Sequence, residues 1–178
     1  MLLRIDEDLA VQTRALGCWR CGKVLHAGDF TRKPRAVPPG LGERYCRRMS
    51  FCCADRQCRK RRTAPSVRFL SRKVYLSAVV VLVSALRCGP TPKRLRYLQQ
   101  WVGVSQRTLL RWRRWWREVF TQTPFWRMAG GSLMPPVQPE ELPASLLERF
   151  AGGASERLLA LLRYLTPISS ESAAMRTA

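Results

Sequence analysis

The seven cysteines are the residues of this sequence best suited to chemistry. Cys18 and Cys21 enclose two residues and are followed by Gly22. This spacing lets two thiolates face one ion, and the glycine frees the backbone to turn beneath it. An odd number of cysteines also leaves at least one outside any set of disulfides. Metal ligation therefore explains the pair better than a disulfide framework does.

Several cysteines compete for the other two ligand positions. Cys53 and Cys58 enclose four residues, within the usual spacer of two to four, whereas Cys52 and Cys58 enclose one residue too many. We predict that one structural Zn²⁺ is bound by Cys18, Cys21, Cys53 and Cys58, with Cys46 and Cys52 as alternatives to Cys53. The competing interpretations are free structural thiols, or His26 in place of one cysteine.

Positive charge is concentrated in the middle of the chain, whose formal net charge is +20. Residues 18–73 contain 16 basic and three acidic residues, net +13, and residues 74–118 contain nine and one, net +8. Residues 1–17 are net −1 and residues 119–178 are neutral. A polyanionic partner is therefore expected between residues 18 and 118, with phosphate contacts from the run Arg59, Lys60, Arg61 and Arg62. Arg68 follows closely behind this run.

A second group of arginines follows a helical period. In a helix over Ser105–Phe120, Leu109, Trp112 and Trp116 share one face, and arginines lie near the opposite one. Arginine can donate two hydrogen bonds to guanine in the major groove. The expected DNA contacts from this helix are Gln106, Arg107, Arg111, Arg113, Arg114 and Arg117. The alternative is an amphipathic helix whose arginines are merely solvated.

Residues 94–112 resemble the helix-turn-helix of bacterial repressors and transposases. With Gly103 as the turn glycine, the five apolar positions of that motif are Leu98, Val102, Val104, Leu109 and Trp112. Residues 18–120 as a whole resemble the DNA-recognising front part of insertion-sequence transposases. A transposase would also need spaced catalytic carboxylates, but the chain after residue 120 has five glutamates and no aspartate. The resemblance thus implies DNA recognition without the catalytic domain.

The expected fold is mainly α, with a small zinc-stapled loop and β module and a helix-turn-helix. Glycine and proline interrupt any helical period in residues 18–66, where large apolar side chains are too few to order the segment without a staple. Helix-length apolar runs begin at Val74. The predicted divisions are an N-terminal helix or tail (1–17), the zinc module (18–66), the helix-turn-helix domain (67–128), a linker (129–143), C-terminal helices (144–166) and a disordered tail (167–178).

These features predict a non-enzymatic, sequence-selective protein that binds double-stranded DNA, either a mobile-element accessory protein or a transcriptional regulator. Acidic residues near Met1 argue against an export signal, and the longest apolar run, residues 74–86, is too short to span a bilayer. A cytoplasmic location without membrane contact is expected. The alternatives are a zinc-dependent protein-interaction adaptor and an RNA-binding protein, and the C-terminal helices could contact a protein partner.

Overall fold

The computed structural model describes residues 1–35, 37, 40–70, 75–85, 91–93, 96, 100 and 103–170. The chain forms two compact units, the first made of residues 1–74 and 165–178 and the second of residues 75–164. Helices predominate, and two small antiparallel sheets lie in the first unit. The structure thus agrees with a mainly helical chain that carries a small β module. Among the described helices, none has the length and apolar character needed to cross a membrane.

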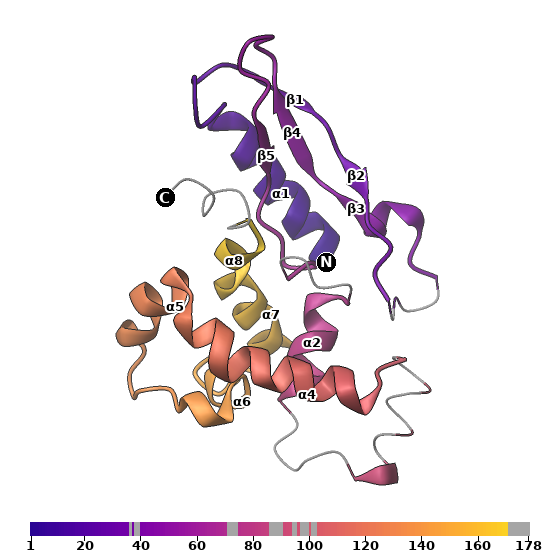
Figure 1. Ribbon diagram of the computed structural model, residues 1–178, viewed down its shortest axis with the longest axis vertical. Coiled ribbons are helices and arrows are strands. Elements are labelled where there is room, and N and C mark those ends of the chain that lie inside the picture. Colours follow the sequence, from indigo (N-terminus) through magenta and orange to yellow (C-terminus); the bar gives the residue numbers. More distant parts are fainter. Residues whose placement is uncertain are drawn as a thin grey trace. The chain divides into compact units, whose positions relative to one another are not determined.

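The first unit packs a helix against a sheet (Figure 1). Its elements are α1 (Leu2–Ala15), β1 (Leu25–Ala27), β2 (Phe30–Thr31), a 3-10 turn (Glu43–Cys46), β3 (Arg47–Arg48), β4 (Ser50–Cys53), β5 (Arg61–Thr63) and α8 (Thr166–Ser170). The larger sheet has the antiparallel order β1-β4-β5, and β2 pairs with β3. Ala10 of α1 packs with Leu25, Phe51 and Cys53 of the sheet, and these residues form a small apolar cluster between helix and sheet.

The buried residues of helix α1 are not its large apolar residues. Two of its apolar residues, Val11 within the helix and Leu16 just after it, are both 70% exposed. The buried residues of α1 are instead Asp6, Ala10 and Thr13, which share one side of the helix at intervals of four and three residues. Hydrophobic periodicity alone cannot identify this face, because one of its buried positions is a carboxylate.

Asp6 forms a buried ion pair with Arg68, and both side chains are fully inaccessible to solvent. The Asp6 carboxylate accepts hydrogen bonds from Arg68 Nε (2.8 Å), the Val67 backbone N–H (2.7 Å) and the Ser66 hydroxyl. The remaining guanidinium nitrogens of Arg68 donate to the backbone carbonyls of Tyr45 and Arg47. Arg68 therefore stabilises the fold and is not available to contact phosphate.

The short helix α8 belongs to this unit and corrects the expected extent of the disordered tail. Residues 167–170 are helical, and Ile168 and Ser169 are buried. The hydroxyl of Ser169 accepts a hydrogen bond from the Ser66 backbone N–H (2.7 Å), and its carbonyl accepts one from Arg48 (3.3 Å). The rest of the predicted tail, residues 171–178, lies outside the described residues.

The second unit is a helical assembly. Its elements are α2 (Ser77–Ser84), α4 (Gln106–Arg114), a π-helical turn (Trp115–Val119), a 3-10 turn (Phe120–Gln122), α5 (Pro124–Ala129), two further 3-10 turns (Gly130–Ser132 and Pro139–Glu141), α6 (Ala144–Leu147) and α7 (Ala154–Tyr164). Helix α2 packs against α4 and α7, and α6 packs against α7. The buried rings of Trp112 and Tyr75 are in contact, and the buried Phe120 contacts Trp116 and the half-buried Trp126.

The two units divide the chain differently from the sequence analysis. Helix α1 lies in the same unit as the cysteine-containing segment, and residues 129–164 lie in the same unit as α4. Val137 and Leu142 of this segment are buried. The segment expected to be a linker thus contributes to the core of the second unit.

The Asp6 and Arg68 pair generates a stability prediction. Replacing Asp6 with alanine leaves the buried guanidinium of Arg68 without its counter-charge, so Asp6→Ala should lower the free energy of unfolding by about 3–5 kcal/mol. The matched control is Asp8→Ala, because Asp8 is an exposed acid on the same helix, and we expect a change below about 0.5 kcal/mol there. Urea denaturation followed by circular dichroism measures both. Equal effects of the two substitutions would contradict the structural role of the pair.

Candidate metal centre and arginine face

Four thiols meet at one end of the first unit. The sulfur atoms of Cys18, Cys21, Cys53 and Cys58 all lie within 4.8 Å of one another. The Cys21 and Cys53 sulfurs are 3.4 Å apart, and those of Cys18 and Cys58 are 3.7 Å apart. Four sulfurs around a tetrahedral metal with bonds of about 2.3 Å would be separated by about 3.8 Å. The cluster can therefore hold a metal ion, and its members are the four cysteines favoured by spacing.

A tight turn positions the first two thiols. Gly22 N–H donates to the Cys18 carbonyl (2.8 Å), and Cys18 N–H donates to the Lys23 carbonyl (2.9 Å). Gly22 has a φ of +71°, and Gly17, which precedes the turn, has a φ of +67°. A Cβ atom on Gly17 would lie 2.7 Å from the carbonyl oxygen of Gly22. Glycine at position 17 thus permits the close approach of backbone that closes the turn.

The end of β4 and the turn after it supply the other two thiols. Cys53 is the last residue of β4, and the Asp55 carboxylate accepts hydrogen bonds from the N–H groups of Gln57 (2.8 Å) and Cys58 (3.2 Å). Asp55 also forms an ion pair with Lys23. This pair connects the two thiol-bearing turns, so Asp55 both shapes its own turn and holds it beside the first.

The pKa values of two of the thiols are shifted in opposite directions. Backbone N–H groups of Arg20 and Cys21 hydrogen-bond to the Cys18 sulfur and lower its pKa to about 6. Burial raises the pKa of the Cys53 thiol to about 12. The four sulfurs cannot all ionise side by side without a cation between them. A thiolate-binding divalent ion would remove this conflict by deprotonating its ligands.

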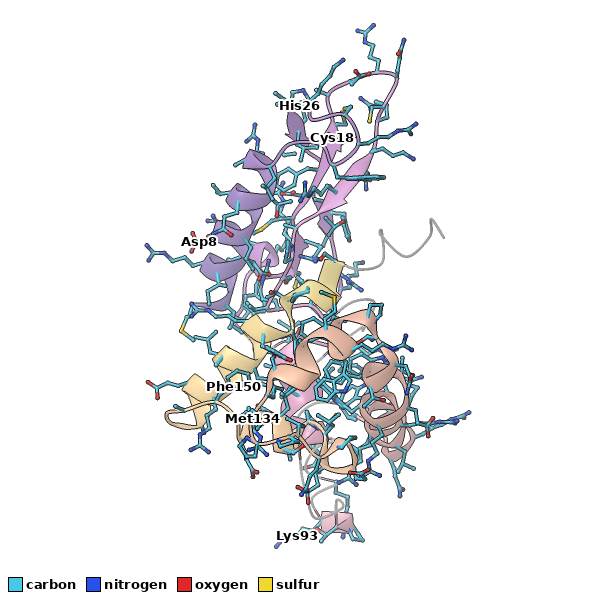
Figure 2. All side chains as sticks on the ribbon, turned by 90° about the vertical axis from the view of Figure 1, so that its left-hand side faces the viewer. Asp8, Cys18, His26, Lys93, Met134 and Phe150 are labelled. Carbon is cyan, nitrogen blue, oxygen red and sulfur yellow. The ribbon has the colours of Figure 1, made fainter. Side chains whose placement is uncertain are left out.

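The remaining candidates for ligands lie outside the cluster. Because successive side chains of a strand point to opposite faces, Cys52 lies on the opposite face of β4 from Cys53. It pairs across the sheet with His26 of β1. The Cys52 sulfur contacts the Arg59 carbonyl at 3.7 Å. Cys46, like His26, is absent from the group of neighbouring ligand atoms. Figure 2 labels Cys18 and His26, which lie at the same end of this unit.

In the second unit, the segment that begins with α4 carries buried tryptophans on one side and exposed arginines on the other. Ser105 caps the helix by accepting a hydrogen bond from the Thr108 N–H (3.3 Å). On one side, Leu109, Trp112 and Trp116 are at most 2% exposed. Away from this side, the exposed polar residues include Gln106, Arg107, Arg111, Arg114 and Arg117. Arg114 forms an exposed ion pair with Glu118 (2.6 Å), an interaction of small energy in water.

Only part of the helix-turn-helix pattern falls on described residues. Val104, Leu109 and Trp112 are buried as the pattern requires. Gly103 has the positive φ, +61°, that suits a turn glycine, and its carbonyl accepts a hydrogen bond from the Tyr75 hydroxyl (3.3 Å). Leu98, Val102 and most of residues 94–102, which form the first part of the motif, lie outside the described residues. The helix-turn-helix therefore stays a prediction.

The basic residues assigned to phosphate contacts have different surroundings. Arg59, Lys60 and Arg61 are exposed, whereas Arg62 is half-buried and donates to the Gly17 carbonyl (3.0 Å). Arg113 is also only partly exposed. Together with Arg117 it lines a small pocket of about 130 Å³ that also contains Glu140 and Glu141. These acids lower the positive potential around Arg113 and Arg117, and the hydrogen bond to Gly17 occupies Arg62. These three arginines are therefore less suited to bind phosphate than the other exposed basic residues.

Comparison of this chain with protein-family models, with curated proteins and with solved structures finds no match. The likeness to transposases therefore rests on the residues of the motif alone.

The cluster predicts which cysteines are needed for metal. Cys21→Ser removes one of four ligands at an exposed position, where packing is little affected, so the purified variant should lose most of its bound metal. Cys52→Ser is the matched control, since Cys52 adjoins a ligand in sequence but faces away from the cluster. Mass spectrometry of metal content should find roughly one ion per chain in the parent and in Cys52→Ser. Metal loss in the Cys52 variant would refute the assignment.

Proposed function

We propose that this chain is a non-enzymatic, sequence-selective protein that binds double-stranded DNA. In this account α4 lies in the major groove, and a module stabilised by Zn²⁺ adds contacts to phosphate. The biological settings that fit are an accessory role in a mobile element and transcriptional regulation.

The two-sided character of α4 is the observation that carries the proposal. Trp112 and Trp116 anchor the helical segment in the core, while Arg107 and Arg111 project into solvent on the other side. Arginine can donate two hydrogen bonds to the O6 and N7 atoms of guanine, and Gln106 in the first turn suits adenine. A rigid anchored helix places these donors more precisely than a loop would.

The first unit contributes a second exposed set of cations. Arg59 and Lys60 follow directly on Cys58, in the turn that the thiol cluster shapes. A structural metal would keep these side chains in place, and four thiolates in tetrahedral arrangement are the ligand set that Zn²⁺ prefers. Phosphate contacts of this kind orient a protein on a duplex without reading its sequence.

Selection of random duplexes by the full-length protein tests the proposal. Arg107→Ala and Arg111→Ala should each relax preference at particular base pairs, with a loss of about 1–3 kcal/mol there. Arg59→Ala should instead weaken all duplexes about equally. The matched control is Arg127→Ala, an exposed arginine on α5, which should leave both affinity and specificity unchanged.

The salt dependence of binding separates this function from its alternatives. Six to ten phosphate contacts predict an affinity loss of about 10³–10⁵ between 50 and 200 mM salt. Binding of a protein partner that survives high salt and nuclease treatment would favour an adaptor. Equal affinity of Arg107→Ala for every duplex, or a preference for RNA over duplex DNA, would contradict base reading by α4.

A further inference from the structure

A groove runs between α1 and β5 within the first unit, with a volume of about 480 Å³. This volume is in the range of sites that bind ligands or peptide side chains. Its helical wall is one stripe of α1, formed by Leu9, Gln12, Thr13 and Leu16. The opposite wall consists of Arg61, Arg62, Thr63 and Pro65, and Trp19 and Ser170 complete the lining. Leu16 is 70% exposed and Trp19 58% exposed, so apolar surface faces the groove without cover from the described residues.

The wall opposite α1 is the open edge of a sheet. Strand β5 is last in the order β1-β4-β5, and it pairs only with β4 in the described part of the chain. Cys53 N–H donates to the Lys60 carbonyl (2.9 Å), and Ala64 N–H donates to the Met49 carbonyl (3.2 Å). These bonds identify residues 60, 62 and 64 as the positions whose backbone faces β4.

Backbone groups alternate along a strand, so those of Arg61 and Thr63 point away from β4. Among the described residues, no hydrogen bond from a loop or side chain reaches their N–H and C=O groups. Two donors and two acceptors are thus presented at the groove. An added strand is the ligand that satisfies such a row, because its own backbone groups alternate with the same period.

The charges around the groove indicate what kind of peptide would bind there as an added strand. None of the described lining residues is acidic, and Arg61 and Arg62 lie on one wall. The surrounding residues 18–73 have a net charge of +13. In an extended peptide, successive side chains point to opposite sides. Apolar side chains could therefore enter the groove against Leu16 and Trp19, while acidic ones on the other side of the peptide lie beside the exposed Arg61.

We propose that the groove between α1 and β5 binds an extended acidic segment of a partner protein, which adds to the edge of β5 as a further strand. The main-chain groups of Arg61 and Thr63 provide its hydrogen bonds, and the α1 stripe with Trp19 provides the apolar contact. This interaction surface is independent of the DNA-contacting face of α4, because every residue that lines the groove belongs to the first unit.

The test uses a phage-displayed library of random dodecapeptides, panned on the full-length, metal-loaded protein after nuclease treatment. The expected enriched peptides alternate apolar and acidic residues. Thr63→Pro removes one outward N–H at an edge position where proline is tolerated, and should weaken the enriched peptides roughly tenfold. Thr63→Val, which keeps that N–H and the shape of the side chain, should bind within about twofold of the parent.

A second pair of variants tests the helical wall. Leu16→Glu places a negative charge in the groove, whereas Val11→Glu places it on α1 outside the groove lining, and both parent residues are 70% exposed. Only Leu16→Glu should abolish peptide binding. If both glutamate variants bind as the parent does, or if the enriched peptides are basic or lack alternation, the proposal is overturned.

Amide hydrogen exchange distinguishes the possible occupants. The amides of Arg61 and Thr63 should exchange rapidly in the free protein and become protected when an enriched peptide binds. Protection already present in the free chain and lost on deletion of residues 171–178 would show that the chain's own terminus fills the groove, which overturns the proposal. Protection of these amides by an unrelated oligonucleotide in place of peptide would overturn it as well.

Discussion

The approach of four thiols to within 4.8 Å of one another is the constraint on which the first unit depends. These thiols bring the turn after α1 together with the end of β4 and the turn that follows it, more than thirty residues later in the sequence. The apolar cluster beneath it is small, with Ala10, Leu25 and Phe51 among its few members, and Val67, Phe69 and Ile168 are buried elsewhere in this unit. The cluster alone offsets little of the entropy lost on folding. A metal bound by all four thiols would add its binding free energy directly to that of folding.

The second feature is that some arginines are buried and stabilise the fold, whereas others are exposed to solvent. Arg48 and Arg68 are buried in the first unit, where they bind carbonyl groups and Asp6. Burial lowers the pKa of Arg48 to about 10, a measure of how poorly water solvates it there. Arg107 and Arg111 on α4 are exposed and remain available to a ligand. The net charge of +20 therefore overstates the charge available for binding a polyanion.

Local patterns in the sequence predicted local features well. The spacing of Cys18 and Cys21 and the apolar stripe of Leu109, Trp112 and Trp116 depend on neighbours within a turn or two, so residue types alone indicate them. The buried pair of Asp6 and Arg68 joins residues 62 positions apart. From the sequence alone, Asp6 is indistinguishable from an acidic residue exposed to solvent. Helix α8 was missed for the same reason, because its stability comes from contacts with Ser66 and Arg48. The open edge of β5 also required the strand order.

X-ray absorption at the zinc edge of the purified protein tests the central claim most directly. The account predicts zinc in about one copy per chain, with four sulfur neighbours at about 2.3 Å and a spectrum that is unchanged in Cys46→Ser. A first shell that contains nitrogen or oxygen would mean that the cluster of Cys18, Cys21, Cys53 and Cys58 is not the binding site. A folded protein without metal would show that the four thiols stabilise the unit by packing alone.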